Sequence, residues 1–191
     1  MNFGIVVEDD RDGAAYQELI KKIRQDVEHV VPFPCHGVST LKKVFIKGLK
    51  YFRYHSQYSI DKAMVIRDSD CSDAPALEND LEQVYVASKL QTGFSVRFHA
   101  TKCELETWLL VDENAINQAA LRRGKRGRLG ALKIQFESYA HAKELFVERL
   151  IETGLPDTPQ VYQEIALFTD IKRIKAHCPH FQSFTAKVQS P

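Results

Sequence analysis

The chain has 191 residues, of which 44% are hydrophobic and 27% are charged, and its formal net charge is +1. This size and composition are those of one globular domain with a real core, so wholesale disorder is excluded. The near-zero total charge does not identify a class of partner, because binding depends on where charges gather along the chain.

The expected cellular location follows from the N-terminus, the hydropathy and the cysteines. The chain opens with Met-Asn-Phe-Gly-Ile-Val-Val-Glu, and no stretch approaches the ~18 apolar residues of a membrane span. We therefore expect neither a signal peptide nor contact with a membrane. The four cysteines are widely spaced and form no CxxC pair, so we expect neither a zinc ribbon nor a disulfide framework. A reducing cytoplasm is the expected location.

In the first half of the chain, short apolar strands alternate with amphipathic helices. The pattern predicts strands at 3–7, 29–33, 63–66 and 94–99, separated by periodic helical stretches at 15–27, 41–52 and 75–90. Asp10 or Asp12 is expected to cap the first helix, and Ser39 the second. This order predicts an α/β fold with a mainly parallel sheet of about four strands flanked by helices.

The second half of the chain is expected to be helical. Apolar residues continue in helical register from Cys103, with Trp108 as a core anchor, and the remainder is broken by Gly154, Pro156 and Pro179. We expect one domain made of an α/β core at 1–112, a basic loop region at 113–131, and a helical C-terminal extension at 132–191 packed on the core.

Acidic residues follow two of the predicted strands. Glu8 follows the first strand, and Asp68-Ser69-Asp70 follows the third. Ligands of parallel α/β sheets bind at the carboxyl ends of strands, and in a strictly extended chain Asp68 and Asp70 share one face. Carboxylates are the oxygen ligands that Mg²⁺ or Mn²⁺ prefers, so the three acids predict a metal site. The alternative is that each acid caps the helix that follows it.

Three motifs resemble those of a known family. Val7-Glu8-Asp9-Asp10-Arg11-Asp12 is similar to the first Toprim motif, and Val65-Ile66-Arg67-Asp68-Ser69-Asp70 is similar to the Toprim DxD motif. The run from Glu104 to Asp112 resembles the E-x-E-x-W-L-L-x-D signature of a subgroup of Toprim-like domains of unknown function. This subgroup is related to the Toprim nuclease domain of overcoming-lysogenization-defect proteins. The resemblance implies a Toprim-like, Rossmann-like fold.

The resemblance also implies a Mg²⁺-dependent phosphodiesterase or nuclease centre. Glu8, Asp68 and Asp70 would be metal ligands, with Asp12 and Glu104 or Glu106 near a second ion. For Glu104 and Glu106 the alternative is a solvated helix face. The chain departs from the family at Asp9, where Toprim domains usually have glycine, and no tyrosine can be assigned as a topoisomerase nucleophile. Hydrolysis by a metal-activated water is therefore the expected chemistry.

A basic stretch is the expected contact with nucleic acid. Five of the seven residues in 122–128 are cationic, and the two glycines allow the backbone to follow a phosphate chain. The expected nucleic-acid-binding residues are Arg122, Arg123, Lys125, Arg126 and Arg128. The alternative is a solvated linker.

Two other classes of function stay open. The chain could be a non-catalytic Toprim-like module that binds a partner protein, such as an ATPase acting in phage defence or DNA maintenance. The resemblance implies that an ATPase could also be the partner if the chain is a nuclease. It could also be a phosphoacceptor receiver-like domain, since Val6-Val7-Glu8-Asp9-Asp10 resembles the first strand and acidic pair of receivers. The receiver pattern fails later, because no Thr or Ser followed by Lys-Pro is found.

Overall fold

Four short runs rich in β-branched and aromatic residues form the sheet in the computed structural model. The structure describes residues 1–191 except for the side chains of residues 38 and 39. The strands are β1 (Asn2–Val7), β2 (His29–Pro34), β3 (Lys62–Asp68) and β4 (Ser95–Thr101). All three pairings are parallel and the strand order is β2-β1-β3-β4. The prediction of an α/β fold with a four-stranded parallel sheet is confirmed.

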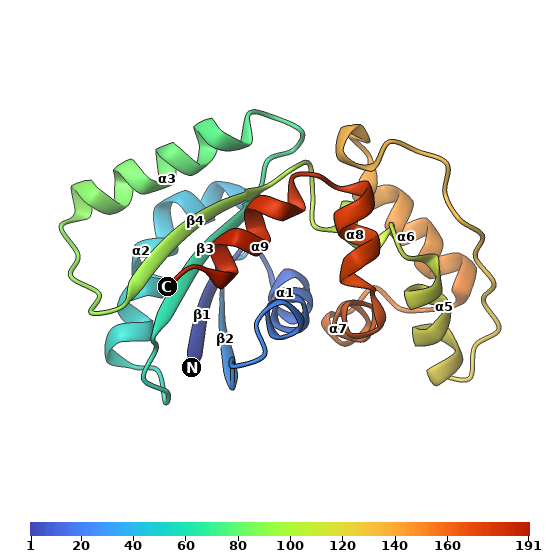
Figure 1. Ribbon diagram of the computed structural model, residues 1–191, viewed down its shortest axis with the longest axis horizontal. Helices are drawn as coiled ribbons and strands as arrows, with labels where there is room; N and C mark the ends of the chain where they lie inside the picture. Colours follow the sequence, from blue (N-terminus) through green and yellow to red (C-terminus); the bar gives the residue numbers. More distant parts are fainter.

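Helices cover both faces of this sheet. Helix α1 (Asp10–Ile23) packs on one face, and α2 (Val38–Tyr54) and α3 (Ala74–Ser88) pack on the other (Figure 1). Each face of the sheet has its own hydrophobic core, and successive β1 side chains point to opposite faces. Ile5 packs in the core with α1, and Val6 packs in the core with α2. Because the first crossover leads from β1 to β2 and the next leads back past β1 to β3, the strand order reverses between β1 and β3. Open α/β sheets bind ligands at such a point.

The helix starts differ in part from the predictions. Asp9, not Asp10 or Asp12, is the N-cap of α1; its side chain accepts from the amides of Arg11 and Asp12, and Asp12 accepts in return from the Asp9 amide. This reciprocal pair satisfies helix donors that otherwise lack partners. Helix α2 starts one residue before Ser39, whose predicted capping side chain lies outside the described part of the chain.

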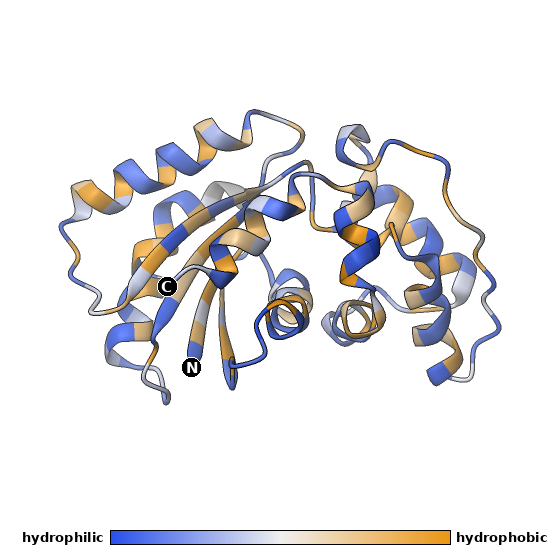
Figure 2. Ribbon diagram, in the orientation of Figure 1, coloured by the Kyte–Doolittle hydropathy of each residue, from blue (hydrophilic) through white to orange (hydrophobic). Residues whose placement is uncertain are grey.

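Hydrophilic and hydrophobic bands alternate along α3, as expected for a helix half exposed to water (Figure 2).

The rest of the chain is a run of short helices, as predicted. They are α4 (Glu106–Leu109), α5 (Glu113–Arg122), the 3₁₀ turn η1 (Phe136–Ser138), α6 (Ala142–Thr153), α7 (Pro159–Phe168), α8 (Ile171–His177) and α9 (Phe181–Gln189). Helix α7 packs along α1, and α9 returns to the sheet beside β4 (Figure 1). Of the predicted basic loop region, residues 113–122 form α5. None of the helices that the structure describes is both long and apolar enough to cross a bilayer.

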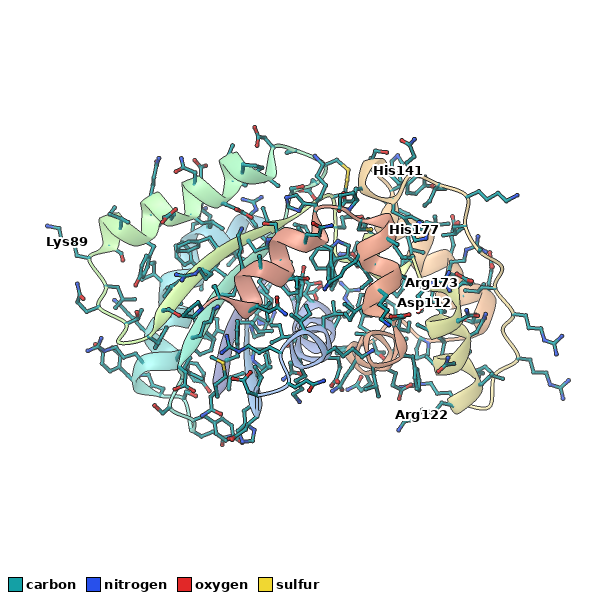
Figure 3. All side chains as sticks on the ribbon, in the orientation of Figure 1. Lys89, Asp112, Arg122, His141, Arg173 and His177 are labelled. Carbon is teal, nitrogen blue, oxygen red and sulfur yellow. A yellow bond between two sulfur atoms is a disulfide. The ribbon has the colours of Figure 1, made fainter. Side chains whose placement is uncertain are left out.

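Trp108 holds the helical part of the chain against the core. Its side chain is fully buried and its ring lies 4.6 Å from that of Phe181 and 5.2 Å from that of Phe184. The prediction of a core anchor is confirmed. A second tie is the ion pair between Asp112, just before α5, and Arg173 of α8, which lie side by side in Figure 3 with 3.1 Å between Oδ1 and Nη1.

Candidate metal centre

Four carboxylates from separate parts of the chain meet at the carboxyl edge of the sheet. Glu8 follows β1 and Asp68 ends β3, on either side of the point where the strand order reverses. Asp12 comes from the first turn of α1 and Glu106 from the first residue of α4. We call Glu8, Asp12, Asp68 and Glu106 the carboxylate cluster. Its position is the one at which this fold class binds ligands.

Hydrogen bonds fix each member of the carboxylate cluster. Glu8 Oε1 accepts from the Asp68 amide at 3.0 Å, and Asp68 Oδ1 accepts from the Leu105 amide at 3.1 Å. Glu106 Oε1 accepts from the Tyr162 hydroxyl at 2.9 Å. The loops after three strands are thus connected through the carboxylates themselves, and these bonds hold the acids close together.

Burial and mutual repulsion raise the pKa values in this cluster. Burial raises the pKa of Glu8 to about 7, although the hydrogen bond from Asp68 and the charge of Arg67 oppose the shift. Burial also raises the pKa values of Asp12 and Asp68 well above the usual range, and the charge of Glu106 adds to both shifts. Gathering acids in this way is unfavourable unless protons or a cation compensate their charge.

The chemistry of the donor set, though not its present arrangement, suits a hard divalent cation. All four side chains offer carboxylate oxygens, the ligands of Mg²⁺ and Mn²⁺. Glu106 Oε2 is buried and has no hydrogen-bond partner within the described part of the protein. Such an atom normally has a partner, and a cation would supply one. As they stand, no three His, Cys, Asp or Glu side chains among those described are arranged to hold a metal ion.

Lys143 faces the carboxylate cluster and was not predicted from the sequence. It lies in the first turn of α6, where its amide donates to Glu104 Oε2 at 2.8 Å. Burial alone would lower the pKa of Lys143, but the charges of Glu106 and Asp12 raise it above its ordinary value. A cation therefore stands permanently beside the acids. No strand end or motif marks Lys143, so only the fold could reveal it.

Asp70 and Glu104 lie at the edge of the cluster. β3 ends at Asp68, and Asp70 takes a left-handed conformation (φ 47°) with an exposed side chain. The prediction that Asp68 and Asp70 share one face of an extended chain is therefore wrong, because the chain turns between them. Glu104 is half-buried and its charge helps to raise the pKa of Asp68. Glu106 is buried, so the solvated-face alternative is wrong for this residue.

A disulfide joins Cys71 and Cys103, although the wide spacing of the cysteines gave no reason to expect a disulfide framework. The two residues are 32 positions apart in sequence, but they follow neighbouring parallel strands, β3 and β4, whose ends lie side by side. This proximity depends on strand order, which the spacing of cysteines does not reveal. The other two cysteines, Cys35 and Cys178, are free and buried.

The basic segment, residues 122–128, lies away from the carboxylate cluster. Arg122 is the last residue of α5 and points outward at its end (Figure 3). Gly127 packs so tightly on Thr153 that a Cβ would clash, which places the segment at the C-terminal end of α6. Lys143 is at the other end, and ten residues of helix separate the two by about 15 Å. Arg123 is paired with Glu164 at 2.8 Å, whereas the other four cationic residues are exposed.

The raised pKa of Glu8 predicts a pH-dependent stability. Between its ordinary value of 4.5 and its folded value of about 7, Glu8 holds a proton in the folded state but not in the unfolded state. Without metal, the free energy of unfolding should therefore fall as pH rises through this window, by up to about 3 kcal/mol from this group.

Urea unfolding of the wild type and of Glu8→Gln from pH 5 to pH 8 checks this prediction. The difference in free energy of unfolding between the wild type and Glu8→Gln should change between pH 5 and pH 7 and level off above pH 7. Burial lowers the pKa of His99 to about 4, which has the opposite effect below pH 6.5, but both proteins share His99. Parallel stability curves for the two proteins would contradict the assignment.

The fold and this site define an α/β domain with an acidic cluster at the carboxyl edge of a parallel sheet, where the strand order reverses. No family model matches the chain, and no curated protein matches it either. Among solved structures, the chain is similar to the C-terminal region of the OLD protein of Xanthomonas campestris pv. campestris. The two share 13% sequence identity over 98% of each chain, with a TM-score of 0.43.

Proposed function

We propose that this protein hydrolyses phosphodiester bonds in nucleic acid and depends on Mg²⁺ or Mn²⁺ held by the carboxylate cluster. The observation that supports this most is the convergence of four buried or half-buried acids with one facing lysine at the ligand-binding edge of the sheet. An acidic cluster alone suits a cation. The lysine beside it adds a group that suits an anion such as phosphate.

Each residue has a role in this proposal. Glu8, Asp12 and Asp68 would hold the cation, and Glu106 would use its free Oε2. When bound, the cation acidifies water and stabilises negative charge on phosphate oxygens. Lys143 would stabilise the negative charge that grows on the scissile phosphate group as the leaving oxygen departs. Asp70 and Glu104, at the edge of the cluster, are the residues for a second ion.

The basic segment supports a polymeric substrate. It lies about 15 Å from Lys143 along α6, a distance that roughly four or five nucleotides of one strand would span at about 3.4 Å each. A mononucleotide could not reach both sites. The proposal is therefore for cleavage of a strand, with the basic segment holding phosphates beyond the one that is cut.

Charge reversal at Arg126 and Arg128 tests the role of the basic segment. Both side chains are exposed, so the double variant Arg126→Glu/Arg128→Glu should fold normally. We expect its Kd for a single-stranded oligonucleotide to rise about tenfold or more. The negative slope of log association constant against log salt concentration should become shallower by about 2. Fluorescence anisotropy at several salt concentrations measures both. The matched control is Lys172→Glu/Lys175→Glu, on the exposed side of α8; an equal loss in the control would contradict a specific role.

A cleavage assay tests the proposed function itself. Pure protein is incubated with plasmid DNA, single-stranded DNA and structured RNA in Mg²⁺, in Mn²⁺ and in EDTA, beside Glu8→Ala and Asp68→Ala. The proposal expects cleavage that needs the cation and disappears in both variants. Cleavage that survives EDTA or either variant would contradict it, and binding of the cation without cleavage would favour a module that acts with a protein partner.

A further inference from the structure

The Cys71–Cys103 disulfide lies between two loops that carry the candidate metal ligands. Cys71 directly follows Asp70, and Cys103 directly precedes Glu104. The bond brings the two Cα atoms to 3.9 Å. Any change in this bond therefore acts on residues adjacent to the carboxylate cluster, and neither sulfur has a part in the proposed hydrolysis.

The two ends of the disulfide differ in their access to solvent. Cys71 is half-buried, whereas Cys103 is only 1% exposed. A thiol reagent from solution would thus attack the sulfur of Cys71, with Cys103 as the leaving group. Cys103 Sγ lies 3.4 Å from the carbonyl oxygen of Glu137, which can accept a hydrogen bond from the thiol that reduction creates. Reduction would therefore not leave the buried Cys103 thiol without a hydrogen-bond partner.

The disulfide is one of a small number of links between these loops beyond the end of the sheet. The amides of Ser69 and Asp70 both donate to the Cys103 carbonyl oxygen at 3.0 Å, and the Cys103 amide donates to Ser69 Oγ at 3.0 Å. Beyond residue 70, the remaining links are the disulfide and weaker bonds from Lys102 to the carbonyl oxygens of Cys71 and Ser72. Asp70, Cys71 and Cys103 all have left-handed φ angles of 47° to 59°. Aspartate adopts this conformation more readily than most L-residues, but it is rare for cysteine, so Cys71 and Cys103 keep it only where surrounding links require it.

We propose that Cys71 and Cys103 form a thiol–disulfide exchange site, at which a dithiol reductant opens the bond and frees the Asp70 loop. A thiolate of the reductant attacks Cys71 Sγ, the Cys71–Cys103 bond breaks, and Cys103 leaves as a thiolate that takes up a proton. The second thiol of the reductant then displaces Cys71, so two electrons and two protons pass to the protein and the reductant becomes a disulfide.

Freeing this loop completes the metal centre, a consequence that rests on the proposed function. In the oxidised protein Asp70 is held with its side chain in solvent. Once Cys71 is released, opening of the bond from the Asp70 amide to the Cys103 carbonyl oxygen lets Asp70 leave the left-handed conformation and turn its carboxylate toward Glu8. The reduced protein is therefore the form with the higher affinity for the cation.

Hydrogen exchange and metal titration test the proposal. Protein is treated with oxidised glutathione or with dithiothreitol, the thiols are counted by intact mass after alkylation, and the reagents are removed. Amide exchange in residues 69–73 should be at least tenfold faster in the reduced protein and in Cys71→Ser/Cys103→Ser. The affinity for Mn²⁺, measured by calorimetry, should be at least tenfold higher in both.

The controls separate this proposal from the proposed function. Cys35→Ser/Cys178→Ser alters the two buried free cysteines and should keep the full redox response. Equal exchange in the oxidised and reduced proteins, or a response that persists in Cys71→Ser/Cys103→Ser, would overturn the exchange site. If exchange responds but neither form binds Mn²⁺, the redox site stands and the proposed metal centre fails. If both bind Mn²⁺ equally, the centre stands and its redox control is overturned.

Discussion

Replacing Asp68 by asparagine is expected to lower metal-dependent cleavage about a thousandfold, or about 4 kcal/mol of activation free energy. Asparagine keeps an oxygen that can accept from the Leu105 amide, as Asp68 Oδ1 does at 3.1 Å. The change therefore removes a charge and leaves the shape. Since the Asp68 carboxylate lies among other acids that raise its pKa, the loss of its charge should leave the metal-free protein equally stable or more stable.

Cleavage rates and thermal melting in EDTA measure the two effects in the same protein samples. Asp80→Asn is the matched control, because Asp80 is an exposed aspartate of α3 that pairs with Lys42 at the surface. It should keep wild-type activity. A fall in activity that tracks a fall in melting temperature would show that Asp68 has a structural role and contradict the assignment.

Replacing Lys143 by methionine is expected to lower kcat about a hundredfold with a smaller effect on KM. Methionine keeps much of the length of the side chain but removes the cation that faces Glu106 and Asp12. Removal of one group that stabilises developing charge typically costs about 10²- to 10³-fold in kcat. The bond from the Lys143 amide to Glu104 is a backbone bond and should persist.

Steady-state kinetics of Lys143→Met and Lys143→Arg check this role. The arginine variant keeps the charge and should recover part of the rate, whereas Lys175→Met, an exposed lysine of α8, should match the wild type. Equal losses in the methionine and arginine variants would indicate that shape matters more than charge. A wild-type kcat in Lys143→Met would remove this residue from the mechanism.

Local patterns predict the sheet and the meeting of Glu8 with Asp68 at its carboxyl edge, whereas Asp12 and Glu106 were expected only from the family resemblance. Apolar runs that end in acid gave β1 and β3, and neighbouring parallel strands bring their carboxyl ends together. The structure accordingly gathers Glu8, Asp12, Asp68 and Glu106 at one edge. The buried stripe of α2, including Phe45 and Leu49, also follows from spacing alone.

The missed features depend on contacts between distant segments or on single backbone angles. Lys143 reaches the site because α6 packs beside α4, and no local pattern records that packing. The Cys71–Cys103 bond depends on β3 and β4 being neighbours. The exposure of Asp70 depends on its left-handed φ, which a strand pattern with period two does not include.

Calorimetric titration of Mn²⁺ into the reduced, EDTA-treated protein tests the central claim most directly. At pH 8, above the raised pKa of about 7 at Glu8, the carboxylate of Glu8 no longer has to give up a proton to bind a cation. We predict saturable binding of at least one Mn²⁺ per chain, lost in Asp68→Asn and retained in Asp80→Asn. No binding in the wild type, or equal binding in Asp68→Asn, would contradict the carboxylate cluster as a metal centre.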